Sequence, residues 1–131
     1  MRQLSFGLTD MAWHTITEPF EGDVEQFEVA SMAPTQVLPV VPGTAMAPAF
    51  GHIFSGGYAA GYYGYKWAEV LEADAFSLFK EKGIFNREVS GSFRENILSK
   101  GGTEHPMELY VRFRGHKPET RALIEKMGLG K

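Results

Sequence analysis

The sequence contains no cysteine, which excludes disulfide bonds, thiolate zinc ligands and a cysteine nucleophile. It also has no apolar run close to the roughly 20 residues that a helix needs to span a bilayer. The opening residues 1–5 lack the apolar core of a signal peptide. We therefore expect no membrane partner, and we expect a cytoplasmic location because a cysteine-free composition suits a reducing compartment.

Positive charge is scarce in the first half of the chain. Residues 1–65 hold one basic residue and six acidic ones, whereas residues 66–131 hold twelve basic and ten acidic residues. The net charge of −3 gives no overall attraction for a polyanion, so we expect no nucleic-acid partner. The change in charge balance coincides with residues 51–65, which we interpret as a functional segment rather than a linker between domains.

Short motifs of hydrolytic sites are absent as well. No two histidines lie three or four residues apart, so the zinc-binding motif H-E-x-x-H is missing, as is the serine nucleophile motif G-x-S-x-G. The four histidines are His14, His52, His105 and His116. We therefore expect this chain to contribute no metal ligand.

Helical periodicity dominates what is present. Hydrophobic side chains make up 44% of the 131 residues, as in ordinary soluble domains. Apolar residues recur at spacings of three and four, and no segment shows the sustained alternation of a half-buried strand. We expect an all-α fold with helices over residues 3–16, 23–32 and about 62–82, an ordered proline-rich connection over 34–48, and short capped helices over 90–128.

Several residues predict where the helices begin and end. A side-chain oxygen before a helix accepts a backbone N–H, proline suits the first helical position, and glycine after the last turn tolerates a left-handed backbone. These preferences predict starts at Asp23 (with Gln26 in a capping box), at Ser90 or Ser92, at Thr103 and at Pro118, and ends before Gly83, Gly101, Gly115 and Gly128.

Asp74 is out of place on the apolar stripe of the long helix. A bare carboxylate in such a position would be costly to bury. We therefore expect a buried structural partner for Asp74, such as an arginine.

The most unusual segment spans residues 50–67. It places four of the five tyrosines within eight residues and interleaves them with five of the fifteen glycines. One interpretation is a substrate lid whose tyrosine hydroxyls donate to a carbonyl or an oxyanion; the other is a buried helix start, in which Tyr58, Tyr62 and Tyr65 bond only to backbone carbonyls. A base-stacking surface is disfavoured by the acidic flank.

Residues 50–70 closely resemble the C-terminal signature of the thimet oligopeptidase family of zinc metallopeptidases, nearest to its bacterial oligopeptidase A and peptidyl-dipeptidase branch. Further blocks that resemble the family, in the family order, lie at residues 2–4, 10–14, 83–88, 97–104 and 113–118. The resemblance extends over essentially the whole chain.

This resemblance implies that residues 1–131 form a single C-terminal fragment of a larger, mostly helical, zincin-type oligopeptidase. The family's three zinc ligands and its general-base glutamate belong upstream, so zinc is expected in the parent enzyme and none bound by this chain. The expected partners are short peptide substrates and the missing N-terminal portion, and the isolated chain is expected to be inactive. The alternative is a non-catalytic helical peptide-binding or interaction module.

The resemblance also assigns roles. Tyr65 is expected to stabilise the oxyanion, Tyr58 to act as a second donor, and His52 to be their hydrogen-bonding neighbour. The residues expected to bind substrate are His52, Gly56, Gly57, Tyr58, Gly61, Tyr62 and Tyr65. Because helices that pack on the missing portion would expose apolar stripes, notably at Leu4, Leu8 and Met11, self-association of the fragment is also expected.

Overall fold

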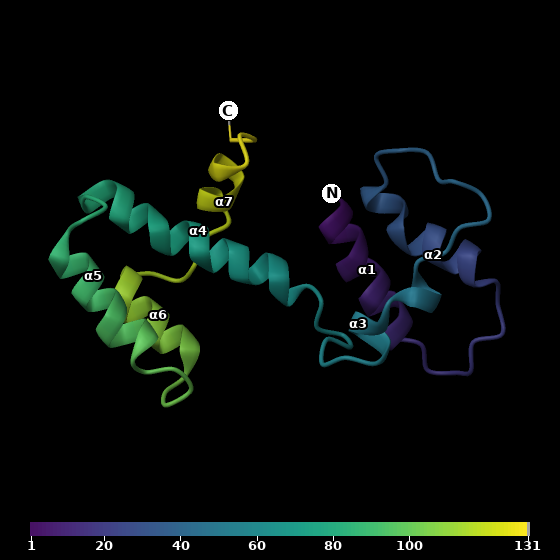
Figure 1. The fold of residues 1–131 in the computed structure, drawn as a ribbon, viewed down its shortest axis with the longest axis horizontal. Helices are drawn as coiled ribbons and strands as arrows, with labels where there is room; N and C mark the ends of the chain where they lie inside the picture. The colour runs from purple at the N-terminus through teal and green to yellow at the C-terminus, as the bar shows by residue number, and fades with distance from the viewer. Residues whose placement is uncertain (131) are drawn as a thin grey trace. The chain divides into compact units, whose positions relative to one another are not determined.

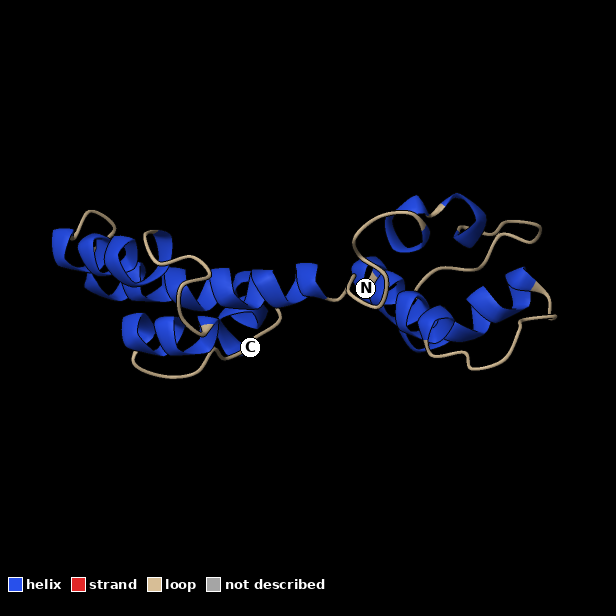
Figure 2. Cartoon of the chain, turned by 90° about the horizontal axis from the view of Figure 1, so that it is seen from below, coloured by secondary structure: helices blue, strands red, loops and turns tan. Residues whose placement is uncertain are grey.

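The computed structural model describes residues 1–130, and within them the chain consists of helices and loops with no strand (Figures 1 and 2). The expected all-α class is therefore confirmed. The chain divides into two compact units, Met1–Lys66 and Trp67–Lys131.

The first unit contains α1 (Arg2–His14), α2 (Val24–Met32), two short 3₁₀ helices η1 (Ala33–Thr35) and η2 (Ala47–Ala49), and α3 (Gly51–Phe54). The helix α4 (Gly64–Lys82) begins in the first unit and continues into the second. The second unit adds α5 (Arg87–Phe93), which runs into a short π-helix η3 (Arg94–Leu98), followed by α6 (Pro106–Arg114) and α7 (Arg121–Lys126).

Helix α1 buries a largely polar face. Ser5, Thr9 and Asp10 are buried, and two of them bond to the neighbouring segment: Ser5 Oγ lies 2.8 Å from Thr35 Oγ1, and Thr9 Oγ1 lies 2.9 Å from Ser31 Oγ. Buried hydroxyls that pair with each other avoid the cost of desolvation without a partner. The face of α1 that packs within this unit is thus the one that hydrophobic periodicity would assign to solvent.

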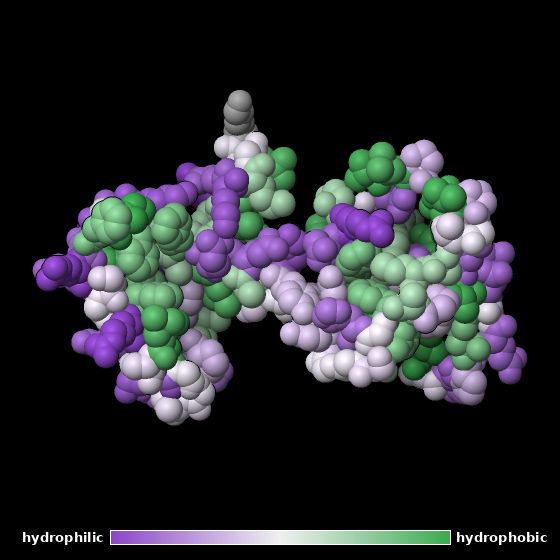
Figure 3. All heavy atoms as spheres, viewed as in Figure 1, coloured by the Kyte–Doolittle hydropathy of each residue, from purple (hydrophilic) through white to green (hydrophobic). Residues whose placement is uncertain are grey.

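Three apolar residues of α1 lie on the surface instead, whereas Phe6 and Trp13 pack against other rings of the unit. Leu4, Leu8 and Met11 are all exposed, as expected from the sequence. Green, apolar side chains also reach the surface on both units in Figure 3. Whether these surfaces cause self-association stays a prediction.

The proline-rich connection is tied to α2 by a carboxylate. Asp23 caps α2 as predicted, since its Oδ1 accepts the Gln26 backbone N–H at 2.9 Å. Farther along α2, the buried Glu28 accepts the backbone N–H groups of Met46 and Ala47. These bonds hold the far end of the connection against α2. The chain then continues through η2 into α3.

The core of the second unit lies between α4, α5 and α6. Phe79, Phe93 and Phe113 meet with ring centroids 5.1–6.2 Å apart. Edge-on and tilted ring pairs of this kind add to the burial of apolar area. Gly83 and Gly115, with φ of 107° and 89°, end α4 and α6 as predicted, because only glycine adopts this backbone without strain.

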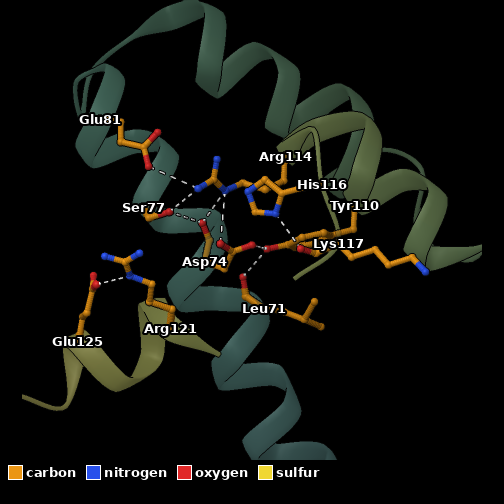
Figure 4. A network of polar contacts seen from close by, with 10 residues as sticks. All are labelled: Leu71, Asp74, Ser77, Glu81, Tyr110, Arg114, His116, Lys117, Arg121 and Glu125. Carbon is orange, nitrogen blue, oxygen red and sulfur yellow. Dashed lines mark hydrogen bonds and ion pairs between the residues drawn. The ribbon is translucent and has the colours of Figure 1, made fainter. Parts of the chain in front are cut away.

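The buried partner expected for Asp74 is Arg114. Figure 4 shows Arg114 and Tyr110 of α6 pointing at Asp74 of α4. Arg114 Nε lies 3.5 Å from the Asp74 carboxylate and donates to its backbone oxygen at 3.0 Å, while Tyr110 Oη donates to Asp74 Oδ2 at 2.6 Å. Burial, followed by the Asp74 carboxylate, raises the pKa of Tyr110 above its ordinary value, so this hydroxyl remains a donor.

Helix α5 begins earlier than the sequence predicts. Its cap is Asn86, whose side-chain oxygen accepts the N–H groups of Glu88 and Val89 at 2.9 and 3.2 Å, so the prediction of Ser90 or Ser92 was wrong. Asparagine is as good a cap as serine, and its place just after the turn at Gly83 lets the helix start one turn sooner.

Two further starts were also placed wrongly. Helix α6 is capped by His105, whose Nδ1 accepts the Met107 N–H at 3.3 Å, with Pro106 as its first residue, rather than by Thr103. Helix α7 begins at Arg121 and not at Pro118. In both cases the local preference for the expected start is weaker than the packing that fixes the helix ends.

Candidate functional site

The tyrosine-rich segment gathers its aromatic side chains around His52. Helix α3 carries His52, and the first turn of α4 carries Tyr65, whose hydroxyl oxygen lies 3.0 Å from His52 Nε2. The Tyr58 ring stacks on the Tyr65 ring at 4.9 Å with 23° between their planes. The rings of Tyr58 and Tyr62 lie 5.1 and 5.8 Å from the imidazole. We call these four residues the tyrosine cluster.

The cluster is exposed on one side and buried on the other. The exposed fractions of Tyr58 and Tyr65 are 41% and 38%, whereas that of Tyr62 is 9%. The Tyr62 ring packs on Phe6 and Phe50, and its hydroxyl donates to Gln3 Oε1 at 3.0 Å. Tyr62 is therefore buried as in the second interpretation of this segment, although its partner is a side chain and not a backbone carbonyl. The first interpretation, a substrate lid, stays a prediction for the exposed Tyr58 and Tyr65.

Tyr65 is held in its protonated form. A hydrogen bond with the Tyr58 side chain, followed by desolvation and the nearby Tyr58 and Tyr62 hydroxyls, raises the pKa of Tyr65 to about 12. At neutral pH the residue is an O–H donor and not a phenolate. An exposed neutral donor beside an imidazole is suited to bind a carbonyl oxygen or a developing oxyanion.

The glycines of the segment differ in what requires them. A Cβ at Gly56 would lie 2.9 Å from the His52 backbone oxygen, so the close turn after α3 needs glycine there. A Cβ at Gly61 would make ordinary contact with the Tyr58 backbone oxygen at 3.5 Å, and one at Gly57 would meet nothing within 4 Å. A substrate-binding role for these three glycines stays a prediction.

Asp10 is the residue that the sequence analysis missed. It is completely buried in α1, and its two carboxylate oxygens accept the backbone N–H groups of Ala60 and Tyr62 at 2.9 and 2.8 Å. His14 Nδ1 lies 2.8 Å from both Oδ1 and the backbone oxygen of Asp10. The available signal was an aspartate and a histidine one turn apart on the same helix, with Gln3 and Phe6 on that face as well.

The described residues do not form a zinc site. Across residues 1–130, no three side chains of the His, Asp or Glu type come close enough together to hold a metal ion. The histidines are engaged elsewhere: His14 with Asp10, His52 with Tyr65, His105 as a helix cap, and His116 with the Lys117 backbone oxygen. The residues present thus do not fit the metal that the family resemblance implies. In the same part of the chain, no helix combines the length and the apolarity needed to cross a membrane.

Comparison with known proteins identifies the family. The profile of peptidase family M3 matches residues 1–129 of this chain. The chain belongs to peptidase family M3. The resemblance inferred from residues 50–70 is therefore confirmed, and the tyrosine cluster lies in an M3 chain.

Among its M3 relatives, this chain is 49% identical over 130 residues to oligopeptidase A of Escherichia coli (strain K12). It is 41% identical over 134 residues to a probable cytosolic oligopeptidase A of Arabidopsis thaliana, and 41% identical over 128 residues to the dipeptidyl carboxypeptidase of Escherichia coli (strain K12). These alignments cover 96–98% of this chain and 19% of each relative. The chain thus spans about a fifth of the length of the relatives it matches.

Proposed function

We propose that this chain is the C-terminal part of a zinc-dependent, cytoplasmic oligopeptidase that hydrolyses short peptides. In this proposal the chain supplies the tyrosine cluster, and the zinc ligands belong to the rest of the enzyme. The observation that carries it is a pair of exposed tyrosines in a chain of family M3. The rings of Tyr58 and Tyr65 stack on each other beside His52. The names of the relatives support a peptidase that acts on oligopeptides.

The cluster's part in the reaction is to stabilise negative charge. When a peptide carbonyl is attacked, its oxygen becomes an oxyanion, and a preorganised donor aimed at that position lowers the barrier. The Tyr65 hydroxyl is that donor, with Tyr58 as a second one. If His52 Nε2–H donates to the Tyr65 oxygen across their 3.0 Å contact, the Tyr65 proton is available to Tyr58, and to a substrate oxygen that takes the place of Tyr58.

The protonation of Tyr65 sets an expected pH dependence. A pKa raised to about 12 keeps the hydroxyl protonated at every pH well below that value. The ratio of kcat between the full-length enzyme and its Tyr65→Phe variant should therefore stay constant from about pH 7 to pH 10. Steady-state kinetics on one peptide substrate measures this ratio. A ratio that collapses near pH 9 would mean that Tyr65 loses its proton there and does not act as proposed.

The alternative, a peptide-binding or interaction module without catalysis, is favoured by one feature of the second unit. An apolar cavity of about 710 Å³ lies between α4, α5 and α6. Its walls include Leu71, Phe76, Phe79, Phe93, Met107 and Leu109. Such a cavity could accept an apolar side chain from a partner without any chemistry.

Metal content and hydrolysis together separate the two functions. We expect the full-length enzyme to contain zinc and to cleave a quenched fluorescent peptide, and the isolated 131-residue chain to do neither. Zinc-dependent cleavage by the isolated chain would contradict our placement of the ligands outside it. A zinc-free full-length protein that binds peptides without cleaving them would favour the module.

A further inference from the structure

A buried carboxylate holds the segment that carries the tyrosine cluster. Asp10 is 0% exposed, and it accepts backbone N–H groups that lie 50 and 52 residues away along the chain, at Ala60 and Tyr62. Each carboxylate oxygen takes one of the two N–H groups. Bonds between an ionised acceptor and a backbone N–H are shorter and stronger than neutral ones, and a buried carboxylate without them would be costly.

The backbone between these two bonds adopts a conformation that needs outside support. Among residues 1–130, Ala60 is the one non-glycine residue with a positive φ, 51°. Alanine reaches this left-handed region only when its surroundings enforce it, because its Cβ crowds the backbone. The bond from the Ala60 N–H to Asp10 is a contact that enforces it directly.

The same bonds determine where the two exposed hydroxyls lie. Tyr58 precedes the held segment, and its backbone oxygen accepts the Gly61 N–H at 2.9 Å. Tyr65 follows it, and its N–H donates to the Tyr62 backbone oxygen at 3.2 Å. Both tyrosines are therefore one turn away from a backbone that is fixed to α1. Small displacements of a catalytic donor are expensive, since a shift of about 1 Å can cost about 100-fold in rate.

We propose that Asp10 is a positioning residue of the peptidase: its carboxylate fixes residues 60–62 so that Tyr58 and Tyr65 stack in reach of the substrate. His14 Nδ1 bonds to the Asp10 backbone oxygen at 2.8 Å and lies 2.8 Å from Asp10 Oδ1, so the imidazole lies beside the carboxylate. This inference rests on the proposed function for its catalytic consequence. The contact between Asp10 and the two amides is independent of it.

The test replaces the Asp10 carboxylate by a carboxamide in the full-length enzyme, so that an NH₂ group takes the place of one oxygen. In Asp10→Asn the NH₂ group faces one of the two backbone N–H groups, so one bond is lost. The matched control is Asp74→Asn, an equally conservative change at a carboxylate that is 3% exposed and bonded to Tyr110 and Arg114 instead of the loop. We expect Asp10→Asn to lower kcat by about 10- to 100-fold with KM changed less than about threefold, and Asp74→Asn to change neither beyond about twofold.

Hydrogen exchange gives a second readout that does not require activity. The amides of Ala60 and Tyr62 should exchange at least about tenfold faster in Asp10→Asn than in the unsubstituted enzyme or in Asp74→Asn. If Asp10→Asn does not fold, the same measurements on Asp10→Glu, which keeps the charge but moves it by one methylene, replace it. Equal kcat and equal exchange in the variants at positions 10 and 74 would overturn the proposal.

The proposed function of the cluster and the positioning role of Asp10 predict different outcomes for the two substitutions. If Tyr65→Phe leaves kcat unchanged, the proposed function of the cluster fails, and faster exchange in the Asp10 variant still establishes the contact as a loop clamp. If Tyr65→Phe lowers kcat while Asp10→Asn behaves as Asp74→Asn does, the cluster is catalytic and Asp10 does not position it.

Discussion

Replacing Tyr65 by phenylalanine in the full-length enzyme should lower kcat by about 100-fold or more while KM stays within about threefold. The substitution removes one hydroxyl and keeps the ring that stacks on Tyr58 at 4.9 Å. A donor that acts mainly on the developing oxyanion contributes to the transition state and little to the ground state, which is why the loss falls on kcat. Initial-rate kinetics over a range of peptide concentrations measures both constants.

The neighbouring tyrosine provides the matched control. Tyr63 is 60% exposed and lies in the same segment, but its ring is not part of the tyrosine cluster. Tyr63→Phe should leave kcat within about twofold, as surface substitutions away from special contacts usually do. An undiminished kcat in Tyr65→Phe would mean that the Tyr65 hydroxyl has a structural role and not a catalytic one. An equal loss in both variants would show a general sensitivity of the segment to losing hydroxyls.

Arg114→Met should destabilise the unit Trp67–Lys131 by about 3–5 kcal/mol, because it leaves the buried Asp74 carboxylate without its cation. Arg114 also donates to Ser77 Oγ at 2.8 Å, and that bond is lost as well (Figure 4). Methionine fills a similar volume, so the loss measures charge and hydrogen bonding rather than a cavity. Urea denaturation of the 131-residue chain, with hydrogen exchange resolved at α4 and α6, measures the change in the free energy of unfolding.

The control for this change is Arg121→Met in α7. Arg121 pairs with Glu125 at 2.7 Å, but the side chains of both residues are well exposed to solvent. Exposed pairs contribute little, so the expected loss is small beside the loss at Arg114. A loss at Arg114 no larger than that at Arg121 would contradict a structural role for the Asp74–Arg114 pair.

The helices were largely predictable, because their periodicity and their terminal residues are local properties. Asp23, Gly83 and Gly115 act as the sequence predicts. The starts at Ser90 or Ser92, Thr103 and Pro118 did not hold. Each is a reasonable cap by itself, and the choice between neighbouring candidates depends on packing that a local pattern does not contain.

For the candidate site, the sequence pointed to one segment, and the structure brings His52, Tyr58, Tyr62 and Tyr65 of that segment together; their functional roles stay predictions. Composition alone does not show which of Tyr58, Tyr62 and Tyr65 is buried, since all three lie in one segment rich in tyrosine and glycine. The fold separates them, because Tyr62 turns inward to Phe6 and Gln3 while the other two remain exposed. Which ring is buried depends on the helix packed against the segment, and that helix lies about fifty residues away in the chain.

The sequence by itself determined the all-α class, most of the helices, the family and the segment that bears the candidate site. Periodicity, composition and motif order are properties of the sequence that do not depend on tertiary contacts. The tertiary structure alone decided that α1 turns its polar face inward and that Asp10 holds Ala60 and Tyr62. The physical reason is that a carboxylate must be paired wherever it is buried, but the sequence does not say which distant N–H groups will reach it. That choice is made only when the helix and the segment pack together.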